Sequence, residues 1–132
     1  MGKYTVSTTA IFGQFTTAQW DSTGILAVPA DFQPPQGTLE YVRVSVLHGN
    51  SGINARSTSG IINIDIFTQN GLGPARGLAI ADMLDEALSW IAINDSGYIQ
   101  TGVSSLSPMG VDGSNPALQR HLYTTQFNYF GV

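Results

Sequence analysis

Two segments near the middle of the chain alternate between hydrophobic and polar side chains. In Glu40–Leu47 the alternating hydrophobic residues are valines, and in Ile61–Phe67 they are isoleucines. A period of two is typical of a strand that turns one face to the core. We therefore predict two strands whose inward-facing side chains share one core: Val42, Val44, Val46, Ile62, Ile64 and Ile66.

The joining segment, His48–Gly60, has no helical pattern, so the two strands are predicted to form an antiparallel hairpin. Its thirteen residues exceed the two to five or so of a usual hairpin loop. It is rich in Gly, Asn and Ser and buries little apolar surface to offset its ordering entropy. We expect either an assembly element ordered by a neighbouring protein or a surface loop without a role. Its candidate interface residues are Ile53, Asn54 and Arg56, and the planar guanidinium of Arg56 suits bidentate pairing with a carboxylate.

A proline followed by a hydrophobic repeat predicts a helix from about Pro74 to Trp90. Proline is favoured at the first helical position. Apolar residues then recur three and four positions apart, as on the buried side of a helix. The stripe consists of Leu78, Ala81, Leu84, Leu88 and Ile91, and the first four are expected to complete the core.

The last third of the chain is predicted to contain two more strands. A turn at Asn94–Gly97 leads into a weak strand, Tyr98–Leu106, and then into a loop with Pro and Gly, Ser107–Pro116. The final segment, Leu118–Phe130, is predicted to be a strand. One face of that strand carries Tyr123, Thr125, Phe127 and Tyr129.

The first forty residues carry weaker signals. Val6–Trp20 has apolar residues at helical spacing and is a possible helix, although its threonines and Gly13 lower the helix propensity. Ile25–Gln36 contains three prolines and is expected to be irregular. The order of elements predicts a single α+β domain, residues 1–132: a four-stranded, mainly antiparallel sheet with one long helix and a possible N-terminal helix on one face.

Composition narrows the class of protein. Charged residues make up 11% of the chain, against about 25% in an ordinary soluble protein. Interface centres are depleted in charge, so this surface suits a subunit that lives against neighbours. The net charge of −4 argues against a conventional nucleic-acid binder. Cysteine is absent, which excludes disulfides and thiolate metal sites. No apolar run approaches the ~18 residues of a membrane span, and the N-terminus lacks the pattern of a signal peptide, so we expect a soluble protein made and used in a cytoplasm.

No catalytic, cofactor or metal site is predicted. His48 and His121 lack partners at metal-ligand spacing and are expected to be ordinary surface or interface residues. Asp82, Asp85 and Glu86 could form an acid–base pair, but the polar face of a helix accounts for them. The segment GLGPARG (Gly71–Gly77) lacks the spacing of a phosphate loop, and a helix start explains it.

Several segments follow one another in a characteristic order and spacing from Trp20 to the C-terminus. They are VPADFQPP (Val28–Pro35), YVRVSVL (Tyr41–Leu47), GIINIDIF (Gly60–Phe67), GLGPA (Gly71–Ala75), LAIADMLDEAL (Leu78–Leu88), YIQTGVSSLSPMGVDG (Tyr98–Gly113) and LYTTQFNYF (Leu122–Phe130). By this order the chain resembles the small tail-terminator, or tail-completion, proteins of long-tailed bacteriophages.

The resemblance implies a non-enzymatic structural protein of the virion, located at the head-proximal end of the tail. It implies a homohexameric ring that stops the tail tube from growing and joins it to the neck. Its partners would be its own copies, the tail-tube protein and a neck or head-completion protein, with DNA passing through the lumen without specific binding and no membrane involved. The alternatives are another head–tail connector or tail-tube subunit, a binding module that uses the hairpin loop, and an enzyme with an unrecognised site.

Overall fold

The protein was analysed as a computed structural model that describes residues 2–51, 55–71, 73–88, 90–93, 97–113 and 115–131. In chain order the elements are α1 (Lys3–Gly13), α2 (Ala18–Asp21), β1 (Leu26–Pro29), β2 (Tyr41–Ser51), β3 (Thr58–Gln69), α3 (Ala75–Leu88), β4 (Trp90–Ile93), β5 (Gly97–Thr101), β6 (Ser105–Val111) and β7 (Leu118–Gly131). Among the helices of these residues, none is long and apolar enough to cross a bilayer.

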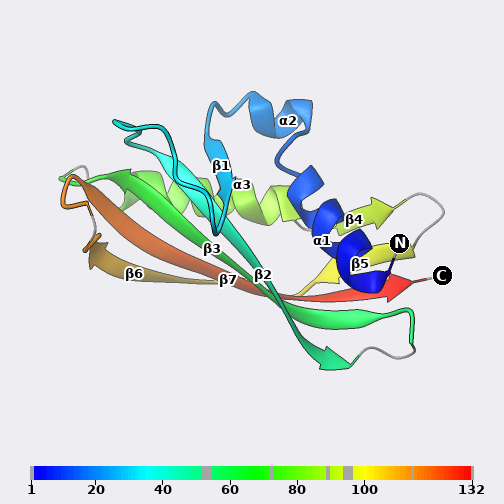
Figure 1. Ribbon diagram of the computed structural model, residues 1–132. Coiled ribbons are helices and arrows are strands. Elements are labelled where there is room, and N and C mark those ends of the chain that lie inside the picture. Colours follow the sequence, from blue (N-terminus) through cyan, green and yellow to red (C-terminus); the bar gives the residue numbers. More distant parts are fainter. Residues whose placement is uncertain are drawn as a thin grey trace.

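The described strands form one mixed sheet in the order β1-β2-β3-β7-β5-β4, with β6 also paired to β7. Strand β7 is the axis of the sheet. It pairs with β3 along one edge, and along its other edge with β6 and then with β5. The long strands β2, β3 and β7 cross the whole molecule, with the helices on one side of them (Figure 1).

The predicted α+β class is confirmed, but the predicted four-stranded, mainly antiparallel sheet with one long helix is wrong. Strand β1 lies in the proline-rich segment that we expected to be irregular, and it pairs in parallel with β2. Pro29 ends this strand at the rim of the sheet, where the missing N–H costs little pairing. Trp90 and Ile91, which we expected in the helix, lie in β4.

The hairpin loop is also shorter than predicted. Strand β2 continues to Ser51 and β3 begins at Thr58, with Asn50 opposite Ser59 and Ser51 opposite Thr58. The polar composition misled the prediction, because Ser57, Thr58 and Ser59 are buried despite their hydroxyls. Gly60 marks a close approach of two strands: a Cβ atom there would lie 1.8 Å from the carbonyl oxygen of Leu47.

The main core lies between the sheet and the helices. The predicted inward faces of β2 and β3 are confirmed, except that Val46 is only partly buried. Helix α3 buries Ala81, Leu84 and Leu88 as predicted, but Leu78 is 50% exposed and Ile80 takes the buried position instead. Other buried members of this core are Ile11, Phe15, Trp20, Ile25, Ile99, Tyr123, Phe127 and Tyr129.

The possible N-terminal helix is confirmed, and a second short helix follows it. Helix α1 buries Ile11, and Phe15 packs edge-on against Trp20 of α2 at 4.9 Å between ring centroids. The indole Nε1 of Trp20 donates to the carbonyl oxygen of Ile25 at 3.1 Å. This contact ties α2 to the start of β1.

Candidate assembly surface

One face of the sheet carries no helix, and most of it is uncharged. Cross-strand pairing places Ser45, Asn63, Thr124 and Ser105 in one row across β2, β3, β7 and β6. The rows on either side add apolar and polar side chains. We call this surface the open face: Ser45, Leu47, Ile61, Asn63, Asp65, Ser105, Ser107, Leu122, Thr124 and Gln126, of which Asp65 alone carries a formal charge.

The open face mixes small hydroxyls and amides with exposed aliphatic side chains. Leu47 is 52% exposed and Ile61 is 37% exposed, and these two residues lie opposite each other. Thr124 Oγ1 donates to Asn63 Oδ1 at 3.0 Å, so part of the polar pattern is already ordered. A low charge density with ordered polar groups and exposed aliphatic groups is the chemistry of an interface centre.

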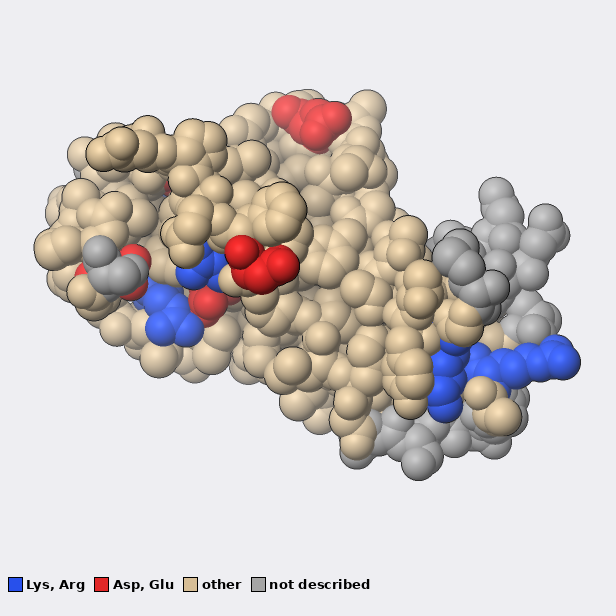
Figure 2. All heavy atoms as spheres, viewed as in Figure 1, with Lys and Arg blue, Asp and Glu red and all other residues tan. Residues whose placement is uncertain are grey.

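Charge is scarce elsewhere on the surface as well. In the view of Figure 2, the Lys, Arg, Asp and Glu side chains form a few separate spots on a mostly uncharged surface. Two arginines form ion pairs with carboxylates of the same chain. Arg76 Nε donates to Glu40 at 2.7 Å, and Arg120 pairs with Asp65 of the open face at 2.7 Å.

One end of the helix-free side is covered and forms a second, smaller core. It contains Val28, Tyr41, Phe67 and Leu118. The rings of Tyr41 and Phe67 stack at 4.5 Å, and the Arg43 guanidinium lies 5.5 Å from the Phe67 ring centroid. Burial raises the pKa of Tyr41, an effect that the Arg43 charge opposes.

A pocket of about 320 Å³ adjoins this smaller core, between the Gln33–Thr38 segment and the 112–118 turn. Arg43 lines it, and the buried Nε of that guanidinium has no hydrogen-bond partner among the described residues. No pattern in the sequence predicted this cluster, because Arg43 is only the polar member of an alternating strand.

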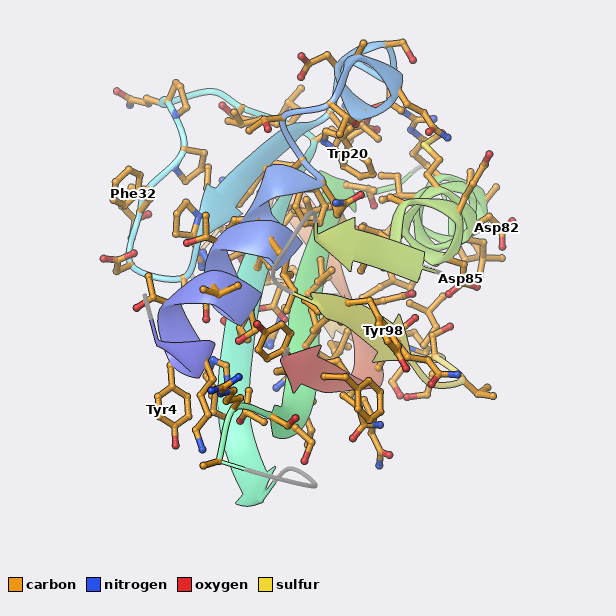
Figure 3. The ribbon with its side chains drawn as sticks, turned by 90° about the vertical axis from the view of Figure 1, so that its right-hand side faces the viewer. Tyr4, Trp20, Phe32, Asp82, Asp85 and Tyr98 are labelled. Atoms are coloured by element: carbon orange, nitrogen blue, oxygen red, sulfur yellow. The ribbon has the colours of Figure 1, made fainter. Side chains whose placement is uncertain are left out.

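The carboxylates of α3 differ in their surroundings. Asp82 and Asp85 both project from the outer side of α3 (Figure 3), and Asp82 and Glu86 are exposed. Asp85 Oδ1 accepts hydrogen bonds from Tyr123 Oη at 2.6 Å and from Ser104 Oγ at 2.5 Å. Burial, and then the bond to Asp85, raise the pKa of Tyr123, so the phenol stays protonated and acts as a fixed donor.

The prediction that both histidines are surface or interface residues is wrong for His121. His121 is 3% exposed and lies under α3, where a Cβ atom on Gly77 would come within 2.7 Å of its ring. His48 is half-buried between α1 and the sheet, with Nε2 at 2.9 Å from Thr8 Oγ1. Burial lowers the pKa of His48. In the described part of the chain, no three His, Asp or Glu side chains group as metal ligands would.

The glycine-rich segment before α3 serves as a helix start. Gly71 and Gly73 adopt positive φ values of 93° and 76°, which favour glycine. Gln119 Nε2 donates to the carbonyl oxygen of Gly73 at 2.6 Å. This hydrogen bond holds the segment against β7.

Of the three predicted interface residues, Ile53 and Asn54 lie outside the described residues. Arg56 is described, and it lies exposed in the turn before β3. Its backbone carbonyl comes so close to Gly131 that a Cβ atom there would be 2.1 Å away. The sequence pattern pointed to this turn but not to the open face. The signal for the open face was the set of polar positions in the alternating strands.

Comparison with known proteins supports the fold alone. No family model and no curated protein matches the chain. A solved structure whose name states no function matches with a TM-score of 0.61 and 13% identity, over 89% of this chain and 84% of the other. At that identity the likeness shows that the two chains share an overall fold.

Proposed function

We propose that this chain is a structural subunit of a bacteriophage virion that forms a closed ring at the head-proximal end of the tail. There it stops growth of the tail tube and joins the tube to the neck. The observation that carries the proposal is the open face, whose side chains are uncharged except for Asp65, which is paired with Arg120, and which therefore suits burial between protein subunits. The resemblance of the sequence to tail-terminator proteins supplies the kind of assembly and the expected number of six copies.

The electrostatics are compatible with a ring that DNA crosses. Each chain has a net charge of −4, so six copies carry 6 × (−4) = −24. Two of the four described arginines, Arg76 and Arg120, are paired with carboxylates, which reduces their attraction for phosphate. A net negative ring repels a polyanion and lets it pass without sticking.

The same surface would also suit a tail-tube or other connector subunit, and assembly separates these roles. We expect negative-stain electron microscopy of the purified chain, alone and with its tail-tube protein, to show single rings and capped tubes. Native mass spectrometry gives the copy number. Long tubes formed by this chain alone would assign it to the tube, and a strict monomer under both conditions would refute the proposal.

A further inference from the structure

Two stretches of strand lack a neighbour along their outer edges in the part of the chain that the structure describes. Strand β6 pairs with β7 on one side only. Strand β2 pairs with β1 only over Tyr41–Val44, so its continuation from Ser45 to Ser51 has β3 on one side and no strand on the other. We call these stretches the β6 edge and the β2 edge.

Neither edge has the charges that usually keep sheet edges apart. Monomeric proteins protect such edges with Lys, other charged residues, Pro or bulges. No Asp, Glu, Lys or Arg occurs in the β6 edge or in the β2 edge. Both edges also expose aliphatic or thioether side chains, with Leu47 at 52%, Met109 at 49% and Val111 at 54%. On β6 the protective features are Pro108 and the bulge after it, and they leave Ser105–Ser107 unhindered. On the β2 edge a register shift lies between His48 and Asn50, and it leaves Ser45–Leu47 regular.

The directions of the two edges are compatible with pairing between copies. The strands β2, β3, β7 and β6 are each antiparallel to the next. If the sheet continues in the same sense, the β2 edge of a second copy runs antiparallel to β6. A contact between two different edges of the same chain is heterologous, which is the kind that builds a ring.

The two edges are also staggered along the strands by an amount that suits closure. The centre of β6, Pro108, aligns through His121 and Ile66 with Val42 of β2, which is six residues before His48, the centre of the β2 edge. Six residues span about 20 Å along a strand, and four strands span about 19 Å across the sheet. The implied strand tilt is about 45°, at the upper end of the range found in closed barrels.

We infer that β6 of one copy pairs antiparallel with the Ser45–Ser51 stretch of β2 in the next copy, so that the sheet continues from subunit to subunit around the ring. This rests on the proposed function and specifies its interface. The open face then becomes one continuous surface of the ring. Because the contact joins unlike edges, each copy uses one edge toward each neighbour.

Cross-linking tests the inference directly, because the chain has no cysteine. Ser107→Cys on the β6 edge and Leu47→Cys on the β2 edge are prepared as separate proteins, mixed, and treated with a short bismaleimide. We expect covalent dimers from the mixture and at most traces from either variant alone. A Thr9→Cys variant, on the exposed side of α1, serves as the partner in control mixtures and should give no dimer.

Three results would overturn the inference. Dimers from Ser107→Cys alone would show like edges meeting about a two-fold axis. If rings assemble but the mixture of Ser107→Cys and Leu47→Cys gives no cross-link, this interface is refuted and the proposed function still stands. A wild-type chain that stays monomeric, also with tail-tube protein, would refute both.

A charge placed on an edge gives a second, independent measurement. Ser107→Lys is expected to raise the concentration needed for ring formation at least tenfold, while the exposed Thr9→Lys leaves it unchanged. Circular dichroism of both variants checks that the fold is intact. Normal assembly of a folded Ser107→Lys protein would contradict the inference.

Discussion

Tyr123 on β7 and Asp85 on α3 are joined by a hydrogen bond of 2.6 Å from the phenol to the carboxylate. Ser104, in the connection between β5 and β6, donates to the same carboxylate oxygen. Asp85 therefore joins the long helix, the central strand and the start of the β6 edge. A residue that resembled part of a solvated helix face holds in place the strand that we propose for subunit contact.

Removing the phenol hydroxyl should weaken this junction without opening a cavity. We expect Tyr123→Phe to lower the free energy of unfolding by about 1 kcal/mol, the usual net value of one hydrogen bond. Urea titration measures the change. Asp82→Asn, one turn away on the exposed side of α3, is the matched control and should have no effect. An unchanged stability of Tyr123→Phe would show that Ser104 alone satisfies Asp85.

The buried side of α3 can be checked with two leucines of the same helix. Leu84 is fully buried and Leu78 is 50% exposed. Leu84→Ala should cost about 2–5 kcal/mol of unfolding free energy, whereas Leu78→Ala should cost less than about 0.5 kcal/mol, as is usual at the surface. Equal costs in a denaturant titration would mean that the helix is rotated from the position described.

Two helical glycines should respond oppositely to the same substitution. A Cβ atom on Gly77 meets the buried ring of His121, while one on Gly13 has open space around it. We expect Gly77→Ala to destabilise the fold by about 1–3 kcal/mol through overpacking, and Gly13→Ala to be neutral or stabilising by up to about 1 kcal/mol. Thermal unfolding followed by circular dichroism compares the two. A neutral Gly77→Ala would show that His121 moves aside freely.

Stability should depend on the protonation of His48. Burial lowers the pKa of this side chain below its ordinary value of 6.5, so between the two values the unfolded chain binds more protons than the folded one. The contribution of neutral His48 to the free energy of unfolding is therefore complete above pH 6.5, and it is lost as the pH falls below that value. Urea titrations from pH 7.5 to 5 should show this decrease in the wild type and a smaller one in His48→Gln. Identical slopes in the two proteins would exclude His48 as the cause.

Elements with a strong local pattern could be predicted from the amino-acid sequence. Alternation in β2, β3 and β7 identified the strands and their buried faces, because side chains of a strand point alternately to opposite sides. The start of α3 followed from Pro74 and the glycines before it. The uncharged character of the surface also came from composition alone. The open face was implicit in these patterns, as the outward half of the same strands.

Features that depend on pairing between distant segments could not be predicted in this way. Strand β1 forms because β2 offers it an edge, although its own sequence contains proline. Ile80 instead of Leu78 is buried because the sheet, and not the helix, sets which side of α3 is covered. His121 is buried because Gly77 leaves room above it. The β2 edge is free because β1 covers only part of β2, and the β6 edge is free because no described strand pairs with the outer side of β6. Neither the length nor the position of a partner strand is encoded in the segment that it leaves uncovered.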